Sequence, residues 1–153
     1  MKVVDRRASD NKYLHRDFHI SMNMLMEYIH DEYGPAALTK YLQQFSQAYN
    51  SQRTKELKKG NLLGLREYFV DIYEKEEWPA SIELKDDVLM VSQESCPGIT
   101  HIKNNGHTPV EQYIETYTTV YEAMCEDTPY EYILEEYDSK TGACRQRFQR
   151  RVK

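Results

Sequence analysis

The sequence predicts a single α+β domain in which a helical layer packs on a four-stranded antiparallel sheet made of two β-hairpins separated by a helix. Three observations predict it. Helical periodicity dominates residues 1–78, a period of two residues appears within 79–153, and the 153 residues match one domain at roughly 100–200 residues per domain. We therefore expect one domain over 1–153, with a helical half (1–78) and a hairpin–helix–hairpin half (79–153).

The helical half opens with residues 11–33, where apolar side chains recur every three or four residues. This stripe consists of Leu14, Phe18, Met22, Leu25, Ile29 and Tyr33. Gly34 and Pro35 predict the end of this helix and the start of a second one, because glycine suits the turn after a helix and proline suits a first position. The second helix is expected to bury Leu38, Tyr41, Leu42, Phe45 and Tyr49. Residues 50–60 predict a short helix or a linker, and residues 61–77 predict a third helix.

The second half changes period at Trp78 and Pro79. Ile82 and Leu84, then Val88 and Met90, alternate with polar residues around a turn at 86–87, which predicts a β-hairpin. Residues 97–106 predict one or two helical turns, and residues 109–126 predict an amphipathic helix. The segments 129–138 and 143–152 flank the turn residues 139–142 and predict a second hairpin.

The charge pattern bears on partners. The chain has 20 Lys and Arg against 25 Asp and Glu, and the basic residues cluster at the C-terminus, so the body is acidic. Because nucleic-acid affinity depends on many phosphate contacts, we expect no nucleic-acid partner and interpret the basic end as a solvated edge strand. No apolar run approaches the roughly 20 residues that a membrane span needs, and the N-terminus lacks a signal-peptide pattern. We expect a cytoplasmic protein with no membrane partner.

Cysteine and tyrosine usage suggest a site for a small molecule. The three cysteines are an odd number without metal-type spacing, which favours free thiols. The 13 tyrosines either line a polar cavity or occupy half-buried helix faces. His15 and His19 have a spacing that can hold zinc, but two ligands do not make a site. Common nucleotide, zincin and serine-hydrolase motifs are missing, so we expect neither a metal nor a cofactor.

Cys96 is the first candidate catalytic residue. It closes a predicted strand and precedes Pro97 and Gly98 at a predicted helix start. Unpaired N–H groups at a helix N-terminus stabilise a thiolate and can also bind a substrate oxyanion or carboxylate. His101, five residues on, could act as base or acid toward a bound substrate. The alternative is that Cys96 is only a small buried apolar residue.

Two further sets of residues are candidate substrate contacts. In the last strand, the alternation places Cys144 on one face and Arg145 on the other. If the arginine face meets a cavity, Arg145 could clamp a carboxylate; if it meets water, it is a solvated side chain. Glu115 could position a substrate amine, or it is a surface carboxylate near a helix N-terminus.

The second half also resembles a known family. The segments ESCPGITHIKNNG (94–106), YIETYTTVYEAMCE (113–126) and YEYILEEYDSKTGACRQRF (130–148) resemble the L-2-amino-thiazoline-4-carboxylic acid hydrolase family over roughly residues 80–150. Members have a CPxxxHL-like segment after a hairpin and a closing strand of the G-x-C-x-x-x-F type. The corresponding residues here are 96–102 and 142–148.

The resemblance implies hydrolytic opening of a cyclic amidine, 2-aminothiazoline-4-carboxylate, by a Cys/His site without a cofactor. Cys96 would be the nucleophile or a polar anchor and His101 the general acid/base. The residues expected to contact the substrate are Tyr113, Glu115, Tyr117, Cys144 and Arg145. One alternative is a non-catalytic small-molecule-binding or sensor domain of the same fold, and another is a pure interaction protein. The oligomeric state is left open, with a homo-oligomer among the alternatives.

Overall fold

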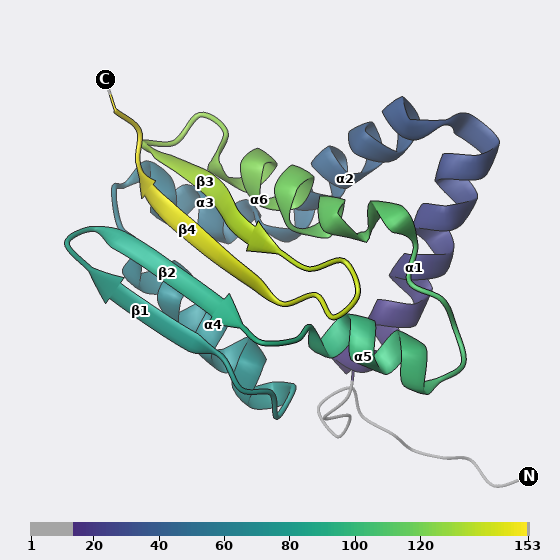
Figure 1. The fold of residues 1–153 in the computed structure, drawn as a ribbon. Helices are drawn as coiled ribbons and strands as arrows, with labels where there is room; N and C mark the ends of the chain where they lie inside the picture. The colour runs from purple at the N-terminus through teal and green to yellow at the C-terminus, as the bar shows by residue number, and fades with distance from the viewer. Residues whose placement is uncertain (1–13, 153) are drawn as a thin grey trace, which may run out of the picture.

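The structure, a computed structural model, describes residues 14–152, with side chains described from residue 18 onward. Helices cover one face of a four-stranded antiparallel sheet, which confirms the predicted α+β class (Figure 1). The first residues of the predicted 11–33 helix, 11–13, lie outside the described residues. None of the described helices is both long enough and apolar enough to cross a membrane.

Four α-helices form the first half of the described chain. They are α1 (Leu14–Tyr33), α2 (Pro35–Tyr49), α3 (Ser51–Lys58) and α4 (Leu63–Lys75). The 50–60 segment is therefore the short helix, not a linker. The buried side of α1 carries Met22, Asn23 and Met26, whereas Phe18 and Leu25 of the predicted stripe are 41% and 37% exposed. Asn23 accounts for this shift, because its side chain bonds Thr108 O and Val110 N and holds the 108–110 loop against α1.

The sheet joins both hairpins. Its strands are β1 (Ser81–Lys85), β2 (Val88–Gln93), β3 (Tyr130–Tyr137) and β4 (Cys144–Arg150), in the order β1-β2-β4-β3. The last strand is therefore not the solvated edge strand that the sequence predicts, because it lies in the interior of the sheet and pairs with both β2 and β3. Figure 1 shows β4 running between them, with the 138–143 loop reaching toward α5 (Pro97–Asn104).

The inward residues of β2 differ from the prediction by one position. Leu84 pairs with Leu89 and Ile82 with Val91, so the buried side chains are Leu89 and Val91, not Val88 and Met90. The turn explains the difference, because Asp86 and Asp87 both have positive φ values of 51° and 60°, the conformation of a two-residue hairpin turn. In such a turn the residues flanking the loop pair directly, and a slip of one residue exchanges the faces of a strand.

The predicted 109–126 helix is in fact two pieces, a 3₁₀ helix η2 (Glu111–Thr116) and α6 (Thr118–Cys125). Threonines surround the break. The Thr116 and Thr118 hydroxyls donate to the carbonyls of Tyr113 and Ile114, which offers the backbone an alternative to regular α-helical bonding. The break matters for the site, because Tyr117 lies at it and Tyr113 lies in the preceding 3₁₀ turn.

Two clusters of buried side chains form the core. The larger cluster lies between α4, α6 and the inner face of the sheet, where the rings of Phe69, Tyr121 and Phe148 pack against one another. The smaller cluster, between α1, α2 and α6, includes Met22 and Leu42. The candidate site lies where these clusters meet.

Candidate functional site

A cavity of about 160 Å³ that opens partly to solvent lies between the two clusters. Its wall is built from α1, α2, α4, η2, α6 and the junction of β2 with α5, and most of it is aromatic or aliphatic. The wall also carries polar side chains, among them those of His19, Glu76, Gln93, Cys96, Tyr113 and Tyr117. The cavity is smaller than the roughly 300–1,000 Å³ of pockets for drug-sized ligands, so its size suits a small heterocycle.

Cys96 lies where the sequence predicts, between the end of β2 and the start of α5. It is the N-cap of α5, with extended backbone angles (φ −91°, ψ 127°). Its N–H donates to the carbonyl of Thr141 at 2.8 Å, which ties this junction to the β3–β4 loop. Its sulfur accepts a hydrogen bond from the Tyr117 hydroxyl at 3.0 Å and lies 3.8 Å from the Tyr113 hydroxyl. The thiol therefore faces two phenols across the cavity wall.

Burial keeps both phenols protonated. It raises the pKa of Tyr113 and of Tyr117 well above the ordinary value, and the nearby Cys96 raises both further. A neutral hydroxyl retains its proton and can donate it. The two tyrosines can therefore act as hydrogen-bond donors toward a bound molecule or toward the sulfur.

Gln93, the last residue of β2, connects the tyrosines to the sheet. Its amide nitrogen lies 3.0 Å from the Tyr117 hydroxyl and 2.8 Å from the carbonyl oxygen of Gly142. Its amide oxygen accepts from the Tyr73 hydroxyl at 2.5 Å. A continuous set of hydrogen bonds thus runs from α4 through the sheet to Cys96.

The second polar group in the cavity is a pair formed by His19 and Glu76. The His19 Nε2 atom lies 3.0 Å from the Glu76 Oε1 atom, and Glu76 is only 3% exposed. A β-carbon placed on Gly98 would lie 2.7 Å from His19 Nδ1 and 2.2 Å from the Tyr113 hydroxyl. Glycine at this position therefore lets α5 approach so closely that His19 and Tyr113 become neighbours beside Cys96.

His101, the expected acid/base, does not line this cavity. Its Nδ1 atom lies 3.4 Å from the Asn105 amide nitrogen, on the same helix. Five residues along a helix at 3.6 residues per turn rotate a side chain to roughly the opposite side, so His101 points away from the Cys96 side. The histidine that shares the cavity wall with the thiol is His19.

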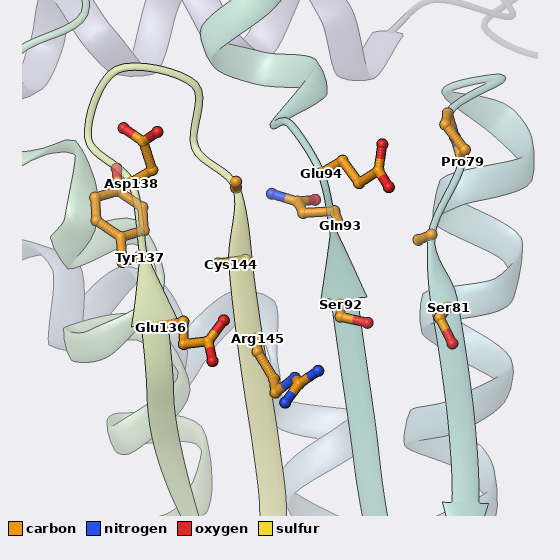
Figure 2. A pocket seen from close by; sticks show the side chains of 12 residues that line it. Pro79, Ser81, Ser92, Gln93, Glu94, Glu136, Tyr137, Asp138, Cys144 and Arg145 are labelled. Carbon is orange, nitrogen blue, oxygen red and sulfur yellow. The ribbon is translucent and has the colours of Figure 1, made fainter.

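Cys144 and Arg145 line a different feature, an open groove of about 840 Å³ at the end of the sheet. Figure 2 shows side chains from the neighbouring strands around it, including Ser92, Glu136 and Arg145. Arg145 is exposed, which matches the solvated alternative. Cys144 is buried on the other face, and burial raises the pKa of its thiol to about 12, with a further contribution from Cys96.

Glu115 also lies outside the cavity wall. Its Oε2 atom accepts hydrogen bonds from Thr39 at 2.9 Å and from Thr119 at 3.0 Å. It therefore links η2 to α2 and α6, which is a structural contact. Of the expected substrate contacts, Tyr113 and Tyr117 are the two that reach the cavity with Cys96.

The cavity residues that were not predicted as site residues include His19, Glu76 and Gln93. His19 carried a signal only as the partner of His15, whose side chain lies outside the described residues. Glu76 belongs to a charged run typical of a surface. Gln93 carried a usable signal, because it is a polar residue at an inward position of β2 after Leu89 and Val91. Among the described residues no group of three or more His, Cys, Asp or Glu could hold a metal ion.

Comparison with known proteins adds no relative. No protein-family model matches the chain, and no curated protein matches it. The resemblance to the thiazoline-carboxylate hydrolases remains a prediction, and any function must be argued from the geometry of the cavity.

Proposed function

We propose that this protein is a hydrolase that opens a small cyclic amidine in the cavity beside Cys96, with Cys96 as the nucleophile. The observation that carries the proposal is the Cys96 sulfur at the cavity wall, 3.0 Å from a donating tyrosine hydroxyl. A donor aimed at sulfur favours the thiolate, which is the nucleophilic form. The proposal keeps the reaction that the family resemblance implies and changes the partner of the cysteine.

The expected reaction has two steps. The Cys96 sulfur attacks the amidine carbon, a sulfur–carbon bond forms, and the ring bond from that carbon to its leaving atom breaks. The leaving atom takes up a proton. Water then attacks the same carbon, and Cys96 leaves as the thiol, so the net change is the addition of one water.

His19 is the proposed proton carrier. It lines the cavity beside Tyr113, and its Nε2 atom lies 3.0 Å from the Glu76 Oε1 atom, which can accept a hydrogen bond from it. A carboxylate behind an imidazole fixes the orientation of the ring. His19 would protonate the leaving atom in the first step and activate water in the second.

A specific observation favours a second candidate, non-catalytic binding of a small heterocycle. Of the described residues that line the cavity, none is Lys or Arg, and the expected clamp, Arg145, lies on the outer groove instead. The largely aromatic wall would hold an apolar ring without any reaction. Because the described cavity wall has no Lys or Arg to pair with a carboxylate, it also favours amidines without a carboxylate over amidines that carry one.

The test is incubation of the purified protein with 2-aminothiazoline-4-carboxylate and, separately, with 2-amino-2-thiazoline, which lacks the carboxylate. Mass spectrometry follows a product heavier by one water. The matched variants are Cys96→Ala and Cys125→Ala, since Cys125 is an equally buried cysteine outside the cavity wall. Product that requires Cys96 but not Cys125 supports the hydrolase. Ligand-dependent stabilisation without product supports the binding protein.

The histidine assignment has its own comparison. We expect His19→Ala to lower turnover far more than His101→Ala. The reverse result would return the acid/base role to His101 and contradict the role of His19.

A further inference from the structure

We propose that Gln93 is a positioning residue that orients the Tyr117 hydroxyl so that it donates a hydrogen bond to the Cys96 sulfur. The inference deepens the proposed function and rests on it in one respect, that Cys96 is the reactive group. It is carried by the hydrogen-bonding capacity of one buried amide and its three partners.

The orientation of the amide follows from its partners. The carbonyl oxygen of Gly142 can only accept a hydrogen bond, and it lies 2.8 Å from one end of the Gln93 amide. That end must therefore be the NH₂ group. The amide oxygen then faces the Tyr73 hydroxyl, which stays protonated because burial raises the pKa of Tyr73. A flipped amide would place two acceptors together at Gly142.

The direction of the next hydrogen bond follows in turn. The NH₂ group has two hydrogens, and its hydrogen bonds of ordinary length go to Gly142 O at 2.8 Å and to the Tyr117 hydroxyl oxygen at 3.0 Å, with the Cys144 sulfur as a weaker third neighbour of the amide. Tyr117 therefore accepts from Gln93 and cannot donate back to it. Its single proton has the Cys96 sulfur, 3.0 Å away, as its acceptor.

The direction of the Tyr117 hydrogen bond decides whether it stabilises the charged or the neutral form of Cys96. A hydroxyl that donates to sulfur stabilises negative charge there, because hydrogen bonds to a charged acceptor are stronger than those to a neutral one. A freely rotating hydroxyl could instead accept from the S–H group, which stabilises the neutral thiol. By occupying the Tyr117 oxygen, Gln93 removes this second arrangement. Gln93 acts on Cys96 only through Tyr117.

The chain offers a matched control in Gln146. This glutamine lies at an inward position of β4, is 1% exposed, and accepts from the Tyr132 hydroxyl at 3.0 Å. Its amide nitrogen lies 3.5 Å from the sulfur of Cys144, not of Cys96. Replacing it removes a comparable buried amide without touching the Tyr117 hydrogen bond.

The experiment measures the rate at which iodoacetamide alkylates Cys96 as a function of pH, with the modified peptide quantified by mass spectrometry. The proteins are the wild type, Gln93→Met, Tyr117→Phe, the double variant of these two, and Gln146→Met. Tyr117→Phe should slow alkylation near neutral pH by about tenfold, the effect of one hydrogen bond to a charged group. Gln93→Met should slow it by a smaller factor, and Gln146→Met should leave it unchanged. In the double variant the rate should equal that of Tyr117→Phe alone.

The proposal would be overturned if the slowing factors of Gln93→Met and Tyr117→Phe multiplied in the double variant. It would also be overturned if Gln146→Met slowed alkylation as much as Gln93→Met does. If Gln93→Met does not fold, Gln93→Glu serves instead, because its carboxylate accepts the Tyr117 proton and turns it away from sulfur. Unchanged or faster alkylation in that variant overturns the proposal. A Cys96 that resists alkylation in the folded wild type would count against the proposed function as well, whereas normal alkylation with an unaffected Gln93 variant would count against this inference alone.

Discussion

The two faces of the sheet carry residues from the same strands but offer very different chemistry. On the inner face, Gln93 and Gln146 are almost fully buried and hold fixed hydrogen-bond partners. On the outer face, Arg145 lies along an open groove that is larger than the inner cavity, about 840 Å³ against 160 Å³. Water screens charges on the open face, whereas buried hydrogen bonds act in a low dielectric. The two faces therefore differ in kind: the outer one offers more space, and the inner one offers fixed polar contacts.

Phe148 gives the largest expected effect for the inner face. The ring is fully buried against Phe69, Tyr121 and Tyr132. We expect Phe148→Ala to lower the free energy of unfolding by about 3–5 kcal/mol, since it removes a large buried ring and leaves a cavity. Urea denaturation measures this. A loss below about 1 kcal/mol would mean that the helices do not cover this face as described.

Gly142 tests how tightly the β3–β4 loop closes over Cys96. Its φ is +70°, and an added β-carbon would lie 2.3 Å from the Cys96 β-carbon. Gly106 has a similar φ of +78° but nothing within 4 Å of the added atom, so it is the matched control.

We expect Gly106→Ala to cost about 1 kcal/mol from backbone strain alone, and Gly142→Ala about 2–4 kcal/mol from strain plus overlap. Chemical denaturation of both variants measures the difference. Equal losses would contradict the close approach of the loop to Cys96.

The pH dependence of the free energy of unfolding at alkaline pH distinguishes a buried Cys144 thiol from a solvated one. Burial raises its pKa from the ordinary 9.0 to about 12. Because the folded-state pKa is above the unfolded value, the protonated thiol's contribution to stability is complete below pH 9 and is lost as pH rises from 9 toward 12. Between pH 9 and 10 this loss is about 1 kcal/mol.

Cys144→Ala should remove that part of the pH dependence, which urea midpoints at pH 8, 9 and 10 would show for both proteins. Identical slopes for the variant and the wild type would mean that Cys144 does not remain buried as a neutral thiol. Buried tyrosines begin to contribute near their ordinary pKa of 10.0, and burial likewise raises the pKa of Cys125 to about 12, so the difference between the two proteins reports Cys144 and the wild-type slope alone does not.

Arg145 gives the smallest expected effect. We expect Arg145→Ala to change the free energy of unfolding by less than about 0.5 kcal/mol, as for an exposed side chain away from special contacts. Amidine turnover and Cys96 alkylation should also stay at wild-type rates. A marked rise in KM for the carboxylate-bearing substrate alone would restore Arg145 as the carboxylate clamp and make the outer groove part of the site.

Local sequence signals placed much of this molecule correctly. The helix ends at Gly34 and Pro35, both hairpins, the position of Cys96 before a helix, and the opposite faces of Cys144 and Arg145 all depend on neighbouring residues in the chain. The errors are equally local in origin. The pattern of apolar residues did not fix the register of the β1–β2 turn, and a shift of one position exchanges the two faces of β2. The threonines near 116–118 break a segment whose periodicity predicts one continuous helix.

The surroundings of Cys96 were decided by the tertiary structure. The sequence by itself determined that a thiol would stand at a helix N-terminus, because a strand end, a proline and a glycine in succession specify that junction. It could not determine that His19 and Glu76 lie on the same cavity wall as Cys96, since these two residues are 57 positions apart and their pairing depends on how separate helices pack. The packing of α1 on α5, where Gly98 leaves room for the His19 ring, is one such contact. Contacts of this kind depend on how helices pack, and packing is a property of the whole core and not of any one segment.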